Sequence, residues 1–124
     1  MTYINHTVRG IPFSRHKSRG NTSAAKTWTD EVIAQTSRLP KVKEACALKV
    51  TFLLPPDKFP GDYPFGPDLD NLLKRMMDAL ERTIFAEARG GDSCVVLLHV
   101  MKTKVKSKEE AGAHIEVLPV SVAS

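Results

Sequence analysis

The sequence predicts an α/β fold of the α+β type, in which a mixed β-sheet packs with two main helices. Three observations indicate it. Strand-like alternation and helix-like spacing of apolar residues follow one another along the chain. The 124 residues are enough to bury one core, and a composition of 42% hydrophobic and 26% charged residues is that of an ordinary globular domain. Neither an internal repeat nor a linker divides the chain, so residues 1–124 are expected to form a single domain.

The first half of the chain predicts two strands separated by a helix. Residues 2–8 alternate in polarity as a strand does, and a helix is expected from Ser23 to Arg38 with an apolar stripe on one face. Residues 47–54 alternate again and predict the second strand, which Pro55 and Pro56 end. Residues 55–67 contain five of the eight prolines and predict an irregular loop.

The second half predicts a helix followed by two strands. Apolar residues at spacings of three and four indicate a helix over residues 71–85. Residues 93–105 are apolar at both odd and even positions, which predicts a central strand covered on both faces, with His99 as a hydrogen-bonded core residue. Residues 114–120 predict a shorter last strand.

Composition excludes several classes of protein. Aromatic residues make up only 6% of the chain, which disfavours single-strand binding by base stacking, and neither a phosphate-binding glycine loop nor a dinucleotide turn is present. No apolar run is long enough to span a membrane and no secretory signal is visible, so a cytoplasmic protein without a membrane partner is expected. Cys46 and Cys94 lack a metal-binding spacing and are expected to be buried free thiols.

Basic residues gather in two segments. The net charge of +4 permits a polyanionic partner, and the first acidic residue is Asp30, after five basic ones. In the second segment lysines recur at every other position, so their ammonium groups leave one face if the strand continues that far. For either segment alone, the alternative to phosphate binding is an ordinary solvent-exposed surface. The expected phosphate-binding residues are Arg15, Lys17, Arg19, Lys102, Lys104 and Lys106, with Lys108 ending the row.

Acidic residues and a lysine gather at the start of the second helix. Asp68 and Asp70 are two residues apart in a segment that Pro67 helps to hold extended, so their side chains should point the same way and suit one cation. Asp70 is also the expected N-cap, and a simple cap is its alternative role. Lys74 lies one turn on, where a cation is unfavourable to the helix dipole unless an anion lies nearby. Its alternative role is an ion pair with Asp78.

Asp92 opens the long apolar strand, where an acid also needs a partner. Convergence of Asp68, Asp70 and Asp92 with Lys74 would make a hard-oxygen site for Mg²⁺, with Mn²⁺ as the alternative ion. Such an ion activates water and, with the lysine, stabilises charge on a phosphodiester that is being cut.

The order of these residues resembles the RusA family of Holliday junction resolvases. The resemblance rests on Asp68-Leu69-Asp70-Asn71 with Lys74 and Asp78-Ala79-Leu80, then on Asp92-Ser93-Cys94-Val95-Val96 with Lys102, and it extends from about Thr7 to Val117. It implies a RusA-like fold, metal binding by the three aspartates, and assistance to phosphodiester cleavage by Lys74. The family usually has paired acids before this strand, whereas here Gly91 precedes Asp92, and Glu87 is the alternative third acid.

The function expected from the residues and the resemblance is a Mg²⁺-dependent, structure-selective endodeoxyribonuclease of DNA recombination and repair. It would resolve four-way junctions by paired symmetric cuts, which favours a homodimer with two identical sites. Two alternatives stay open. One is a branched-DNA-binding protein without activity, and the other is a metal-dependent phosphohydrolase of small molecules.

Overall fold

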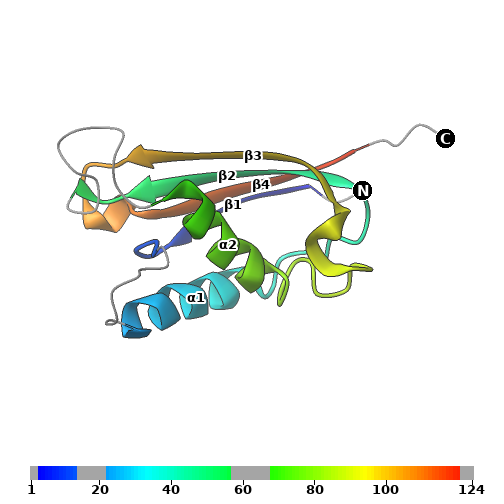
Figure 1. The fold of residues 1–124 in the computed structure, drawn as a ribbon, viewed down its shortest axis with the longest axis horizontal. Coiled ribbons are helices and arrows are strands. Elements are labelled where there is room, and N and C mark those ends of the chain that lie inside the picture. The colour runs from blue at the N-terminus through cyan, green and yellow to red at the C-terminus, as the bar shows by residue number, and fades with distance from the viewer. Residues whose placement is uncertain (1–2, 14–21, 57–67, 121–124) are drawn as a thin grey trace.

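The computed structural model describes residues 3–13, 22–56 and 68–120 (Figure 1). In these residues a mixed four-stranded sheet and two helices form a small α+β fold, as predicted. The expected basic loop around Arg15, Lys17 and Arg19 lies outside the described residues, as does most of the proline-rich segment 55–67.

The sheet consists of β1 (Ile4–Arg9), β2 (Cys46–Leu54), β3 (Val95–Lys104) and β4 (Gly112–Pro119). The strand order is β1-β4-β2-β3. Strand β4 pairs antiparallel with both β1 and β2, whereas β2 and β3 are parallel. Parallel strands need a crossover connection, and the helix between β2 and β3 in the chain provides it.

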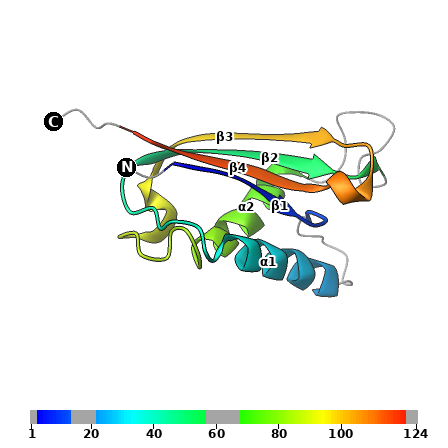
Figure 2. The same cartoon turned by 180° about the vertical axis from the view of Figure 1, so that it is seen from behind.

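Two helices, α1 (Thr22–Thr36) and α2 (Leu69–Leu80), lie on one face of this sheet (Figures 1 and 2). Two short 3₁₀ turns, η2 (Gly91–Cys94) and η3 (Lys108–Glu110), flank β3. Within the described ranges, neither helix covers the opposite face of the sheet. None of the helices described is long and apolar enough to cross a membrane.

The hydrophobic core lies between the sheet and the two helices. Alternate residues of β2 point into it, so Leu48, Val50, Phe52 and Leu54 are all fully buried. Burying aliphatic and aromatic side chains in this way supplies most of the free energy of folding. The helices contribute the other half of the core with Trp28, Val32, Leu72, Met76 and Leu80.

Strand β3 is one of the two edge strands of the described sheet, so the prediction of a central strand covered on both faces is wrong. Its pairing with β2 is the only strand pairing it has among the described residues. His99 is exposed rather than in the core, and Leu97 is 56% exposed. An apolar run at odd and even positions is typical of a strand covered on both faces, and here the part of the chain that the structure describes leaves that cover incomplete.

Two further boundaries differ from the expected ones. Helix α2 ends at Leu80 rather than at residue 85, and the chain turns there. In that turn the Thr83 hydroxyl is buried against the hydroxyl of Thr36, with the two oxygens 2.8 Å apart. Strand β3 ends at Lys104, so Lys106 and Lys108 do not continue the row of lysines along a strand. The backbone N–H of Lys106 instead donates to Glu110 Oε1 at 3.2 Å.

Candidate active site at the start of helix α2

Asp68 is the N-cap residue of α2, which corrects the expectation that Asp70 caps this helix. Asp68 has extended backbone angles, φ −67° and ψ 132°, and the helix begins at the next residue. Its side chain makes no capping hydrogen bond to the backbone. Asp70 lies in the first helical turn, where a negative charge is favourable to the helix dipole. The two carboxylates therefore share one helix end.

Asn71 holds both carboxylates by one hydrogen bond each. Its side-chain Nδ2 donates to Asp68 Oδ2 at 3.3 Å, and its backbone N–H donates to Asp70 Oδ1 at 2.9 Å. The second oxygen of each carboxylate has no hydrogen-bond partner among the described residues, and both side chains are exposed. Exposed carboxylate oxygens that are only partly engaged are the ligands Mg²⁺ prefers, since it binds one or two carboxylates and keeps several waters.

Lys74 lies one helical turn beyond Asp70 on the exposed row of α2. Asp78 follows one turn further, but the two do not form the expected helical ion pair. The ion pairs found within the described ranges are Lys26–Asp30 at 2.7 Å, and Lys43–Glu87 and Lys49–Glu116, both at 3.9 Å.

Lys102 and Lys104 lie on the same face of the sheet as α2. In the parallel register they are level with Phe52 and Leu54, whose side chains are buried under the helices. The end of β3 and the first turn of α2 lie at the same end of the molecule (Figures 1 and 2). Two of the predicted phosphate-binding lysines thus lie at the end of the molecule that carries the two aspartates.

Asp92 lies at the other end of α2. It belongs to η2, and Gly91 beside it lies against the side chain of Glu81, the C-cap residue of α2. Asp70 and Glu81 are eleven positions apart along the helix, which is roughly 16.5 Å at 1.5 Å per residue. In the described part of the chain, no three His, Cys, Asp or Glu side chains form a group that could hold a metal ion. One chain alone therefore does not bring the three aspartates together.

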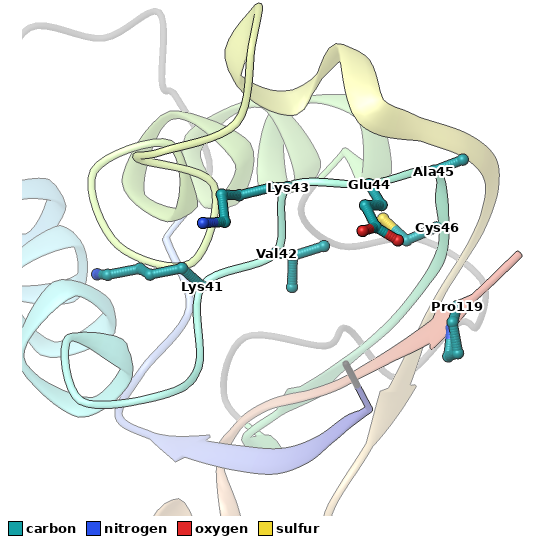
Figure 3. Close-up of a pocket in the computed structure, with 7 residues that line it drawn as sticks. All are labelled: Lys41, Val42, Lys43, Glu44, Ala45, Cys46 and Pro119. Atoms are coloured by element: carbon teal, nitrogen blue, oxygen red, sulfur yellow. The ribbon is translucent and has the colours of Figure 1, made fainter. Parts of the chain in front are cut away.

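Glu87, the alternative third acid, is also remote from the start of α2. Its carboxylate pairs with Lys43 at 3.9 Å, beside the segment that leads into β2. This segment lines a small hollow of about 80 Å³ (Figure 3). Neither Asp68 nor Asp70 lines it, so the hollow belongs to the opposite end of the sheet from the two aspartates.

The two cysteines meet near this hollow. Both are free thiols as predicted; Cys46 is buried, whereas Cys94 is half-buried. Burial, followed by the nearby Cys94 thiol and its hydrogen bond, raises the pKa of Cys46 from 9.0 to about 12. Cys46 therefore stays protonated at neutral pH and is a poor nucleophile.

The sequence reasoning missed Arg75, which lies directly after Lys74. Its Cζ atom lies 5.6 Å from the centre of the Phe13 ring. Arg75 and Lys74, with Asn71 and Asp78, line a second hollow of about 150 Å³ beside α2. The sequence does show a second basic residue next to Lys74, which could have marked Arg75 as a candidate site residue. Nothing in the sequence indicates that Phe13 lies against Arg75.

The fold and this helix end define a small α+β protein. A carboxylate pair, a lysine without an ion pair among the described residues and two basic strand residues lie at one end of it, an arrangement suited to phosphodiesters. The family model described as endodeoxyribonuclease RusA matches residues 12–118, which is most of the chain. The chain belongs to this family. Membership makes it an endodeoxyribonuclease by class and implies branched DNA as its substrate. A search of curated proteins found no match.

Proposed function

We propose that this protein is a Mg²⁺-dependent, structure-selective endodeoxyribonuclease that resolves four-way DNA junctions by paired symmetric cuts in recombination and repair. The observation that carries the proposal is the start of α2. There Asp68 and Asp70 each keep an oxygen without a partner among the described residues, and Lys74 lies one turn away without an ion pair. Membership of the RusA family supports the same substrate class.

Asp68 and Asp70 would hold the metal, since their exposed oxygens are hard ligands at one helix end. When bound, Mg²⁺ lowers the pKa of a water molecule and neutralises charge on the phosphate. Lys74 would place its ammonium group beside the phosphate oxygens and stabilise the charge that grows on them as the bond to the leaving sugar oxygen breaks. Lys102 and Lys104 would hold the flanking backbone without reading its bases.

The protein is proposed to act as a homodimer, and β3 supports this. Four of the six large hydrophobic side chains exposed among the described residues lie on this strand: Val96, Leu97, Leu98 and Met101. They follow a sheet edge whose backbone groups pair with no further strand within residues 3–13, 22–56 and 68–120. An exposed apolar edge strand is a hazard for a monomer and is typical of a surface that pairs with another chain.

A two-fold axis beside the middle of β3 and perpendicular to the strand would also complete the metal site. Such an axis reverses the strand direction in the partner, so the start of one β3 lies beside the end of the other. Asp92 precedes the start of β3, whereas Asp68 and Asp70 lie at the end of the molecule where β3 finishes. Asp92 of the partner subunit would therefore approach Asp68 and Asp70, which one chain alone keeps apart.

The test is incubation of the purified protein with end-labelled four-way junction and with matched linear duplex, with and without Mg²⁺. Paired nicks in the junction alone, dependent on Mg²⁺ and abolished in Asp70→Asn, are the expected result. Junction binding without any cut in Mg²⁺ or Mn²⁺ would favour the inactive branched-DNA-binding protein. Hydrolysis of nucleotides, with binding that is insensitive to salt, would favour the small-molecule phosphohydrolase.

A further inference from the structure

The positive charge of Arg75 is not neutralised by an ion pair with any described residue. Its guanidinium lies over the Phe13 ring, with Cζ 5.6 Å from the ring centre, which is the range of a cation–π contact. Its Nε–H is buried and donates to no partner among the residues described. None of the ion pairs found there includes Arg75. Because this buried atom is closed to a ligand, a phosphate would have to bind the Nη groups of Arg75 instead.

Phe13 fixes the orientation of this guanidinium. The ring is partly buried and packs against the hydrophobic core just after β1. A guanidinium held over a ring by a cation–π contact still has N–H groups that can meet two oxygens of one phosphate. Because the side chain is already held, binding a phosphate costs it less conformational entropy than it would cost a free lysine.

The hollow beside Arg75 has the charge balance of a phosphate subsite. It has a volume of about 150 Å³ and is lined by Asn71, Lys74, Arg75 and Asp78. Two cations and an amide there face one carboxylate. The carboxylate of Asp78 repels a small free anion, but a DNA strand held at several phosphates tolerates one repulsive group. The hollow therefore favours a phosphate that is part of a strand.

We propose that Arg75 binds a backbone phosphate next to the one that is cleaved, with its guanidinium held against Phe13. The inference rests on the proposed nuclease function and adds a contact to it. Lys74 shares the exposed row with Asp70 and faces the phosphate that reacts, whereas Arg75 lies about 100° further round the helix. Arg75 thus positions the DNA strand, while the aspartates and Lys74 take part in the cleavage of the phosphodiester.

The experiment measures junction binding on an Asp70→Asn background by fluorescence anisotropy over a series of salt concentrations, and cleavage in the otherwise native protein. We expect Arg75→Gln to weaken binding about tenfold and to reduce the salt slope by about 0.9, the value for one lost phosphate contact. Both further variants keep the positive charge. Arg75→Lys loses the planar guanidinium with its paired donors, and Phe13→Leu loses the ring over which the guanidinium lies. For these two we expect weaker binding with an unchanged slope. Inorganic phosphate at millimolar concentration should not compete.

Arg82→Gln is the matched control, because Arg82 is exposed and lies just after α2, away from the hollow. It should bind and cut like the native protein. Native affinity and salt slope in Arg75→Gln would overturn the inference while leaving the nuclease proposal intact. If the native protein binds junctions through Arg75 but never cuts them, the nuclease proposal fails and the phosphate subsite stands. Should Arg75→Gln fail to fold, native affinity in both Arg75→Lys and Phe13→Leu would overturn the inference.

Discussion

Asp70 and Asp92 lie at opposite ends of α2, one in its first turn and the other in the 3₁₀ turn that packs against its C-cap residue. The helix between them keeps their carboxylates far beyond the reach of one metal ion, whose ligands lie within about 2–2.6 Å of it. A single subunit therefore supplies two of the three expected ligands at one place. Any site that uses all three aspartates needs a second subunit.

The first prediction tests this division of ligands between subunits. Asp70→Asn and Asp92→Asn, each alone, should lower the cleavage rate by at least about 100-fold, because each removes a ligand from both sites of a dimer. Co-expression of the two variants with different tags allows the heterodimer to be purified. In a shared-site dimer both substitutions fall in one site and the other site is intact. The heterodimer should therefore cut one strand, with about half of the native number of active sites.

A second heterodimer gives the opposite outcome and serves as the control. It pairs a native subunit with one that carries both substitutions. If sites are shared between subunits, each site receives one substitution and this heterodimer is inactive. If each chain holds its own site, the native subunit stays active and the first heterodimer is dead. Single-turnover cleavage of labelled junction DNA distinguishes the two arrangements directly.

The second prediction concerns the exposed face of β3. Leu97→Glu and Met101→Glu each place a charge in the proposed interface, where an unpaired carboxylate would have to lose its water. We expect the dimer dissociation constant to rise at least about 100-fold, by roughly 2.7 kcal/mol or more. Junction cleavage should fall in parallel. Size-exclusion chromatography with light scattering reports the mass.

Ala34→Glu, at an exposed position on α1, is the matched control and should stay dimeric. Dimeric, active Leu97→Glu would count against this interface.

Most elements of the fold were predictable because their local signals agree with their packing. The alternating apolar residues of β2 are buried together only if the segment is a strand, and the apolar stripe of α2 is buried only if the segment is a helix. The position of β3 in the sheet was not predictable in this way. An apolar run indicates that a strand is covered, but it does not say whether helices or a second subunit provide the cover. Nor do the apolar spacings of residues 71–85 show that the helix ends at Leu80.

The candidate site was predictable in part for a similar reason. Asp68, Asp70 and Lys74 lie within seven residues, so the geometry of a helix start brings them together. Asp92 depends on the path of the chain after α2, which no local spacing determines. The contact between Arg75 and Phe13 joins residues far apart in the sequence, and no local pattern pairs them. Local sequence predicts local sites, and tertiary packing decides the rest.

The third prediction concerns Gly112, the first residue of β4. Its φ of +157° is one that other residues rarely adopt, and a Cβ atom there would overlap the carbonyl oxygen of Val8 on β1. We expect Gly112→Ala to lower the free energy of unfolding by about 3 kcal/mol or more, because the backbone of β1 cannot move aside cheaply. Urea denaturation measures it. Gly90→Ala is the control, because its Cβ would meet only the rotatable Ser93 side chain, and it should cost about 1–2 kcal/mol. Equal losses would contradict the argument.

The fourth prediction is a pH dependence that comes from Cys46. Its pKa is raised from 9.0 to about 12, mainly by burial and then by Cys94, so the native state keeps a proton that the unfolded state releases above pH 9. The stabilisation is complete below pH 9 and is lost as the pH rises towards 12. Between pH 8 and pH 10 this group alone should lower the free energy of unfolding by roughly 1 kcal/mol. Lysines and tyrosines titrate in the same range, so Cys46→Ala serves as the reference. Its free energy of unfolding should fall by correspondingly less between pH 8 and pH 10. An identical loss in both proteins, measured by urea denaturation under reducing conditions, would show that the Cys46 thiol titrates normally.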